Sequence, residues 1–194
     1  MKISGMQVTP VNVPLEAPIR WPWGVRAETT RMIVEVFTDE GLTGLGETLG
    51  GNYMPVILKS MEAKLRGEDP FELERILSRF QMTPYFTGYA GRAAVGAVEM
   101  ACWDIMGKAL AQPLHRLIGG KYRETVEFAA YVFARYEHEG KGGENTPEAL
   151  TEYCRRVQKK HGFSVFKYKG GVHPPAFDVE TIRLMREAFG PQMR

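Results

Sequence analysis

The last third of the chain alternates short apolar strands with amphipathic helices, and this alternation constrains the fold most strongly. A strand is predicted over residues 126–133, and a helix over 147–160 that begins after Thr146 as its N-terminal cap. A second strand is predicted over 164–169 and a second helix over 176–189. Strands and helices in this order indicate parallel strands joined by right-handed crossovers. The region is therefore predicted to form part of a parallel β/α sheet.

Two strand–helix units are too few to close a barrel. A closed eight-unit β/α barrel takes roughly 250 residues, whereas only about seventy residues remain here from the first of these strands onward. We therefore expect the 194 residues to be the N-terminal piece of a longer polypeptide. A complete small α+β protein is the alternative. The expected domain division is 1–123 and 124–194, with a truncated second domain.

The first part of the chain is predicted to be an antiparallel meander followed by helices. The turn-rich segment at 39–44 supplies the glycines that a hairpin needs. Apolar residues then recur at helical spacing, and proline stands at suitable first-turn positions. The expected strands are 3–13, 32–37 and 45–48, and the expected helices are 54–65, a segment from Pro70 to Phe80, and 89–110.

Charge and cysteine content exclude several classes of protein. Lys and Arg number 25 against 23 Asp and Glu, so a net charge of +2 gives no basic surface for nucleic acid or an anionic membrane. No run approaches the roughly 20 apolar residues of a membrane span, and the first residues lack the apolar core of a signal peptide. A cytoplasmic protein is expected. Cys102 and Cys154 are too few for a disulfide scaffold and are expected to be reduced and structural.

Lys167 and Lys169 are the strongest candidates for chemistry. They stand two apart on a predicted strand, so both side chains point to one face, which in a parallel barrel is the interior. Each ammonium group disfavours protonation of the other, and burial acts in the same direction, so one amine should work as a base. Apolar residues before the pair and two glycines after it indicate the C-terminal end of a strand, where barrel enzymes carry their chemistry. A solvated lysine pair near a loop is the alternative.

The segment 20–26 (RWPWGVR) is predicted to be a loop with an unusual composition. Two tryptophans and two arginines in seven residues are an odd mixture to leave in solvent. Arg26 or Arg20 could bind a carboxylate with two parallel hydrogen bonds. Trp21 and Trp23 could instead pack against the neighbouring strands.

Three stretches together carry a resemblance to a known family. They are GLTGLGE at 41–47, AVEMACWDIMGKALAQPLHRLIGG at 97–120 and FKYKGG at 166–171. In this order and at this spacing, the chain resembles the mandelate racemase and muconate-lactonizing branch of the enolase superfamily. Within that branch it is most similar to the glucarate dehydratase group, because of KYKGGV, AYVF at 130–133 and TRMIVEV at 30–36.

The resemblance implies an α+β capping domain followed by the first β/α units of a TIM-type barrel, incomplete in this chain. It implies that Lys169 removes the proton α to a carboxylate and that Lys167 is the neighbouring cation that meets the enediolate. Enzymes of this superfamily use a Lys or His base with magnesium. The Mg²⁺ ligands are expected beyond these residues, so no metal ligand is assigned here. None of the four histidines has the strand-end context of the group's His–Asp partner, although His173 could approach the site.

The resemblance also implies a small acid-sugar substrate and a homo-oligomer. Residues 20–26 would be the mobile loop that closes over the substrate, with Trp21, Trp23 and Arg26 in contact with it. Tyr131 and Phe133 would line the pocket, or they could be barrel core.

Departures from the group's pattern leave the identity of the sugar open. Tyr168 stands where the group usually has Leu, Val25 stands near an expected His, and Ala93 or Ala94 replaces an expected Thr. The expected function is an acid-sugar dehydratase, a lyase active only at full length. The alternatives are a racemase or epimerase of the same superfamily, and a non-catalytic capping or oligomerisation module.

Overall fold

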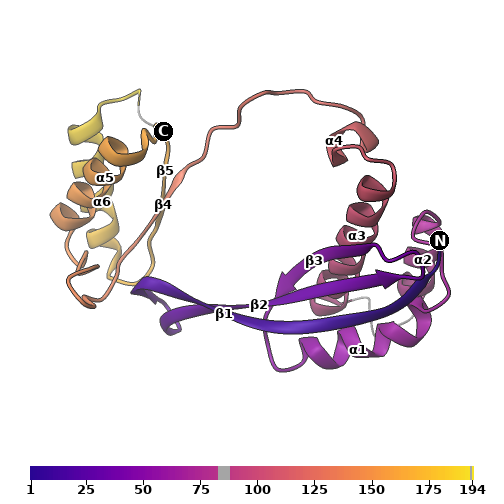
Figure 1. Cartoon of the computed structure of the whole chain (residues 1–194). Coiled ribbons are helices and arrows are strands. Elements are labelled where there is room, and N and C mark those ends of the chain that lie inside the picture. The colour runs from indigo at the N-terminus through magenta and orange to yellow at the C-terminus, as the bar shows by residue number, and fades with distance from the viewer. Residues whose placement is uncertain (83–87, 193) are drawn as a thin grey trace. The chain divides into compact units, whose positions relative to one another are not determined.

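The computed structural model describes residues 1–82, 88–192 and 194 (Figure 1). The chain forms two compact units. The first unit contains residues 1–13 and 30–122, and the second contains residues 14–29 and 123–194. Residues 14–29 therefore group with the C-terminal part of the chain in this division. The assignment of domains at 123/124 stays a prediction.

A three-stranded sheet in the order β1-β2-β3 begins the chain. The expected hairpin at 39–44 is confirmed, since β2 and β3 pair antiparallel with Val34 opposite Gly46. The first two strands are longer than predicted and run on into residues 14–29, so RWPWGVR is not a loop. It is the end of one strand, a turn at Pro22 and Trp23, and the start of the next. The strands are β1 (Ile3–Trp21), β2 (Gly24–Thr38) and β3 (Thr43–Leu49).

Outside residues 83–87, the first unit is completed by four helices. The prediction for α1 matches the structure, whereas α2 begins at Leu73, three residues after Pro70, and α4 was not predicted. The long helix lies against β3, and α1 and α2 pack against that helix (Figure 1). The helices are α1 (Met54–Leu65), α2 (Leu73–Gln81), α3 (Tyr89–Ala109) and α4 (Leu114–Leu117).

The glycines of β3 allow this close approach. A Cβ atom built on Gly44 would lie 2.0 Å from the carbonyl oxygen of Ala101, and one built on Gly46 would lie 1.9 Å from that of Ala97. Both distances are far too short for a real side chain. The glycines of the GLTGLGE stretch therefore serve helix–sheet contact as well as the turn, and Ala97 and Ala101 of the long helix pack on them.

Alternating residues of β2 and one face of each long helix form the first core. Met32, Val34 and Val36 point to this side of the sheet and are buried. Residues from α1, α2 and α3 fill the remainder, including Leu58, Phe80, Val98 and Ile105. Cys102 is buried here as a free thiol, and burial raises its pKa to about 12, so it is inert.

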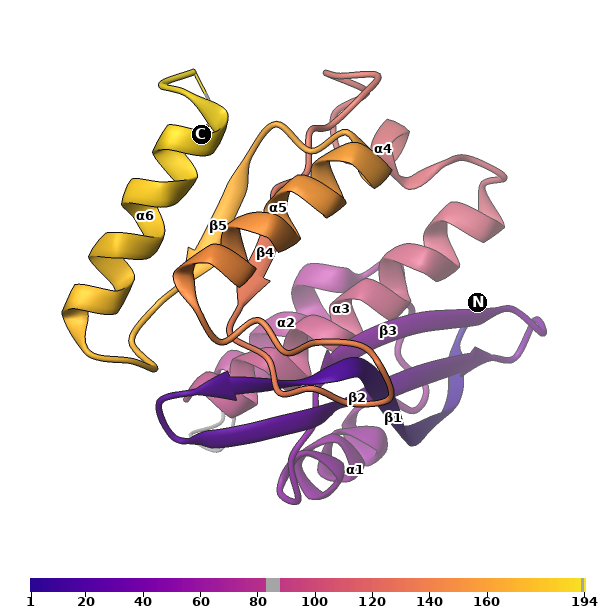
Figure 2. The ribbon, with the colours of Figure 1, turned by 90° about the vertical axis from the view of Figure 1, so that its left-hand side faces the viewer.

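The second unit contains two parallel strands and two helices, as predicted. β4 pairs parallel with β5, and Figure 2 shows α5 and α6 beside these strands. The elements are β4 (Ala130–Phe133), α5 (Pro147–His161), β5 (Phe166–Lys169) and α6 (Pro175–Phe189). The first strand is shorter than the predicted 126–133, because its pairing with β5 begins only at Ala130. Val126 and Phe128 are exposed instead.

Local sequence signals begin and end the helices of this unit. The side chain of Thr146 accepts a hydrogen bond from the backbone N–H of Ala149 at 3.2 Å, which confirms it as the N-terminal cap of α5. Gly162 ends that helix in the left-handed conformation, with φ of +74°. Cys154 lies on the buried face of α5 as a second free thiol.

Within the ranges that the structure describes, no helix combines the length and the apolar character needed to cross a bilayer.

Candidate active site

Lys167 and Lys169 lie on β5, directly opposite two aromatic residues of β4. In the parallel register Tyr131 is the partner of Lys167, and Phe133 is the partner of Lys169. Because side chains alternate along a strand, all four point to one face of the two-stranded sheet. The structure therefore brings together four of the seven residues predicted for the site.

The other face of the sheet is covered by helices. Val132 is buried on this side in a cluster with Leu150, Cys154 and Met185, and Phe166 and Tyr168 pack against the cluster. The lysine face thus points away from α5 and α6. In a closed barrel this face would be the interior. Here both lysines are exposed, because two strands form no opposite wall, so the expected enclosure is not present in the described residues.

The two aromatic rings form a patch beside the lysines. Their centroids lie 4.3 Å apart, and the Nζ atom of Lys167 lies 4.6 Å from the centroid of the Tyr131 ring. A cation held over an aromatic face is attracted by about 0.5–1 kcal/mol at an exposed site. This contact places the Lys167 ammonium over β4.

Tyr168 and Asp178 fix the backbone around the lysine pair from the helix side. The Tyr168 hydroxyl donates to Oδ1 of Asp178 at 2.7 Å, and the N–H of Gly171 donates to Oδ2 at 2.9 Å. Burial, followed by this bond to Asp178, raises the pKa of Tyr168 well above its usual range. One carboxylate in the first turn of α6 therefore holds both the residue between the lysines and the turn after them.

His173 follows that turn and packs on α6. Its ring stacks on Phe177 with centroids 4.0 Å apart, and its Nε2 atom is buried without a hydrogen bond among the described residues. Burial lowers the pKa of His173, and the nearby charge of Arg20 acts in the same direction, against Asp178. A neutral imidazole is therefore favoured. The group's His–Asp partner remains unassigned.

The hairpin made by residues 14–29 belongs to the same unit. At its tip the Trp21 and Trp23 rings meet edge to face at 5.4 Å, and the Arg26 guanidinium lies 4.6 Å from the Trp21 ring centroid. Trp23 is 82% exposed. A Cβ atom on Gly171 would lie 3.8 Å from Cγ of Pro22, so the hairpin turn lies beside the turn that follows Lys169.

Arg20 of the hairpin contacts three residues that follow β4 in the sequence. Its backbone N–H donates to the carbonyl of Ala134 at 2.9 Å, and its guanidinium donates to Oδ1 of Asn145 at 3.3 Å. The guanidinium also lies 4.9 Å from the ring centroid of Tyr136. Asn145 and Tyr136 were not predicted as site residues, since no local motif marks them.

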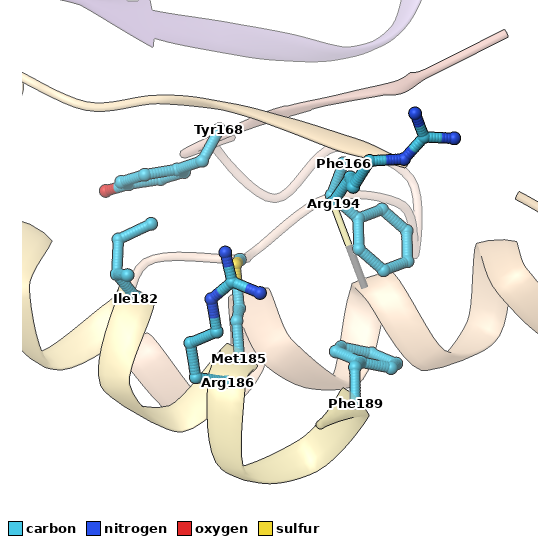
Figure 3. A pocket seen from close by; sticks show the side chains of 7 residues that line it. All are labelled: Phe166, Tyr168, Ile182, Met185, Arg186, Phe189 and Arg194. Carbon is cyan, nitrogen blue, oxygen red and sulfur yellow. The ribbon is translucent and has the colours of Figure 1, made fainter. Parts of the chain in front are cut away.

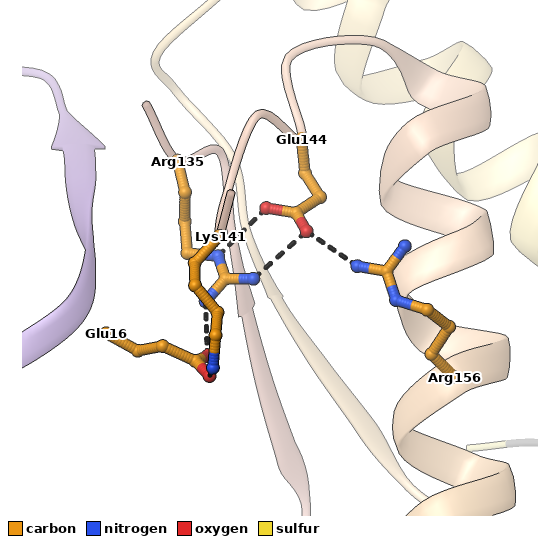
Figure 4. Close-up of polar contacts among 5 residues, drawn as sticks. All are labelled: Glu16, Arg135, Lys141, Glu144 and Arg156. Atoms are coloured by element: carbon orange, nitrogen blue, oxygen red, sulfur yellow. Dashed lines mark hydrogen bonds and ion pairs between the residues drawn. The ribbon is translucent and has the colours of Figure 1, made fainter. Parts of the chain in front are cut away.

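A charged cluster lies at the base of the hairpin (Figure 4). It joins two carboxylates and three cations from β1, the β4–α5 loop and α5. Sequence reasoning missed it, because its members are up to 140 positions apart and match no spacing rule. The members are Glu16, Arg135, Lys141, Glu144 and Arg156.

The carboxylates of Asp104 and Glu180 have partners within the protein. Asp104 accepts from the N–H of Leu45 and from Lys108, and Glu180 pairs with Arg183. The residues that the structure describes contain no group of three or more His, Cys, Asp or Glu side chains that could hold a metal ion.

An apolar pocket of about 200 Å³ lies between β5 and α6 (Figure 3). It opens on the helix side of the sheet and does not include the lysines. Its lining is Phe166, Tyr168, Ile182, Met185, Arg186, Phe189 and Arg194. It is therefore a different feature from the candidate site.

Comparison with known proteins identifies the family. The profile described as "Mandelate racemase / muconate lactonizing enzyme, N-terminal domain" matches residues 3–119. This match covers more than half of the chain, which therefore belongs to the mandelate racemase and muconate-lactonizing family of the enolase superfamily. The chain comprises its N-terminal capping domain and the first β/α units of the barrel.

The relatives are enzymes of more than one kind. The chain is 30% identical to a "Probable glucarate dehydratase" of Streptomyces coelicolor, with 97% of the chain and 50% of that protein covered. It is also 30% identical to an "N-succinyl-L-Arg/Lys racemase" of Bacillus cereus, with 98% and 50% covered.

A solved structure has the same fold. It is an enolase of Thermobispora bispora complexed with magnesium and formate, 35% identical, with a TM-score of 0.88 and coverage of 100% of this chain and 50% of that one. The chain spans about half the length of these relatives.

Proposed function

We propose that these residues belong to an acid-sugar dehydratase, a lyase that acts on a small carboxylate sugar. The observation that carries this proposal is the pair of lysines on one face of β5, at its C-terminal end, opposite Tyr131 and Phe133. The similarity to a probable glucarate dehydratase supports it.

In this reaction the amine of Lys169 takes the proton from the carbon α to the carboxylate. The electron pair left behind forms an enediolate, and the ammonium group of Lys167 stabilises its negative charge. The C–O bond to the β-hydroxyl group then breaks as this group takes the proton back from the Lys169 ammonium group, and it leaves as water. The resulting enol becomes a 2-keto-3-deoxy acid. Trp21, Trp23 and Arg26 would contact the substrate from the hairpin.

Magnesium is proposed as the cofactor because a similar structure is complexed with it. A divalent cation would stabilise the enediolate. The described residues do not fit a magnesium site, since they offer no ligand cluster. The ligands are therefore expected from residues outside this chain, and no step above is assigned to the metal. A cytoplasmic location and a homo-oligomeric state stay predictions from the sequence.

A racemase or epimerase is the second candidate, and the similarity to a racemase favours it. It needs the same proton abstraction, followed by return of a proton instead of loss of the hydroxyl group. The two reactions therefore share Lys169 and differ in product.

The test uses the full-length natural polypeptide that contains these residues, incubated with magnesium and a library of diacid sugars. A dehydratase forms 2-keto-3-deoxy acids, and Lys169→Ala abolishes their formation. Lys159→Ala, on the exposed side of α5, is the matched control and should keep full activity. Epimers alone would favour the second candidate. Full activity of Lys169→Ala would contradict both, and no turnover of any sugar would favour a non-catalytic module.

A further inference from the structure

Residues 14–29 extend beside the chain segment that directly follows β4. The N–H of Arg20 donates to the carbonyl of Ala134, and the N–H of Tyr136 donates to the carbonyl of Pro18 at 2.8 Å. Ile19 and Arg135 form an antiparallel bridge between these two bonds. The base of the hairpin is thus held by main-chain bonds immediately after Phe133, the last residue of the candidate patch on β4.

Arg135 links three segments through its side chain (Figure 4). It donates to both carboxylate oxygens of Glu144, at 2.9 and 3.0 Å, and to Glu16 of β1 at 3.3 Å. Its guanidinium also lies 4.5 Å from the ring centroid of Tyr153 on α5. The side chains of Arg135 and Glu144 are only 12% and 3% exposed, so this pair is largely shielded from solvent and salt.

Two further ion pairs complete the charged cluster. Lys141 contacts Glu16 at 2.7 Å, and Arg156 contacts Glu144 at 2.8 Å. Each carboxylate therefore has two cationic partners. The pairing of Arg135 with Glu144 uses two parallel hydrogen bonds, a geometry that the planar guanidinium provides and a lysine ammonium does not.

The β4–α5 loop is packed too closely against β1 at the base of the hairpin to accept a side chain at Gly142. Gly142 has φ of +80°, and a Cβ atom on it would lie 2.2 Å from the carbonyl oxygen of Tyr136 and 2.7 Å from Cβ of Ala17. Ala17 is itself buried. The β4–α5 loop therefore packs directly on β1 at the level of the charged cluster.

We propose that Arg135 is a positioning residue that anchors residues 14–29 beside the C-terminal ends of β4 and β5. The anchor holds Arg20, Trp21 and Arg26 where they can meet a substrate deprotonated by Lys169, so the inference rests on the proposed function. Arg135 acts through the hairpin and does not touch the reacting atoms. Loss of the anchor should therefore weaken substrate binding more than the chemical step.

The experiment compares Arg135→Met with Arg155→Met in the full-length polypeptide. Arg155, on the exposed side of α5, is paired with Glu152 at 3.6 Å and serves as the matched control. Hydrogen exchange measured by mass spectrometry should be at least roughly tenfold faster over residues 14–29 in Arg135→Met. Exchange over α1 should not change. KM should rise roughly tenfold or more with a smaller fall in kcat, and Arg135→Lys should restore part of both.

Equal exchange over residues 14–29 in the two methionine variants would overturn the anchor. Faster exchange with an unchanged KM would overturn the positioning role. If Arg135→Met does not fold, Glu16→Gln tests the anchor in its place, because it removes only the negative charge that pairs with Arg135 and Lys141. This variant should still raise hydrogen exchange over residues 14–29, and unchanged exchange would overturn the anchor. An inactive wild-type polypeptide would refute the proposed function, while the exchange comparison would still decide whether Arg135 anchors the hairpin.

Discussion

Replacing Tyr168 with Phe removes one hydroxyl group from the helix side of β5 and keeps the aromatic ring in place. That hydroxyl donates to Asp178 at 2.7 Å, and the same carboxylate also accepts from Gly171 at 2.9 Å. The substitution therefore breaks one of two bonds that tie the lysine strand and its following turn to α6. The apolar contacts of the ring remain.

The size of the effect follows from the charge of the acceptor. A hydrogen bond to a charged group contributes roughly 1.5–3 kcal/mol to stability. Both side chains are partly exposed and Asp178 keeps its bond to Gly171, so we expect about 1.5 kcal/mol. For a chain of this size, 1 kcal/mol corresponds to roughly 2–4 °C in the melting temperature, which gives a decrease of about 3–6 °C.

Differential scanning calorimetry of the wild type and Tyr168→Phe measures this decrease. Tyr89→Phe is the control, because Tyr89 is 77% exposed at the start of α3. A melting temperature of Tyr168→Phe that equals that of the control would refute the role given to the Tyr168–Asp178 bond.

Two further predictions concern the packing of β3 and the charged cluster. Gly46→Ala should lower the unfolding free energy by about 1–3 kcal/mol, because the new Cβ meets the main chain of Ala97. Gly96→Ala is the control, because it lies in open space on α3 and should raise the unfolding free energy slightly. Urea denaturation measures both variants, and equal effects would contradict the packing argument. Burial alone would raise the pKa of Glu144, but the hydrogen bonds from Arg135 and the charge of Arg135 outweigh burial and keep it lowered. The contribution of the Glu144 carboxylate to the free energy of unfolding is therefore present above the pKa of about 4.5 in the unfolded chain. It is lost as the pH falls through the lower pKa of the folded state. Glu144→Gln should lower the free energy of unfolding by roughly 3 kcal/mol at neutral pH and by progressively less below about pH 4.5. Unfolding followed by circular dichroism measures this, and a difference between the wild type and Glu144→Gln that does not change with pH would contradict it.

Local signals in the sequence were enough to predict most helices and the direction of the strands. Helix α5 shows why, since Thr146 caps its first turn and its apolar residues recur at helical spacing. The alternation of strands and helices likewise predicted the parallel pairing of β4 and β5, and residue alternation predicted that Lys167 and Lys169 share a face.

Predictions that depend on a distant partner were less complete. The apolar residues before Ala130 suggested a longer strand, but a strand extends only as far as it has a neighbour to pair with. The Pro and Gly of RWPWGVR predict a loop, yet in the structure these residues form the turn of a long hairpin. Arg135 and Glu144 carry no motif, so their pairing with Glu16 could be seen only in three dimensions.

The central claim is that the amine of Lys169 removes the proton α to the substrate carboxylate. The most direct test follows the α-proton signal of the preferred acid sugar by NMR in deuterated water, with the full-length polypeptide and magnesium. The account predicts that the wild type and Lys159→Ala remove this signal and form a 2-keto-3-deoxy acid that carries deuterium at its C3 atom, and that Lys169→Ala does neither. Undiminished loss of the α-proton signal with Lys169→Ala would contradict it.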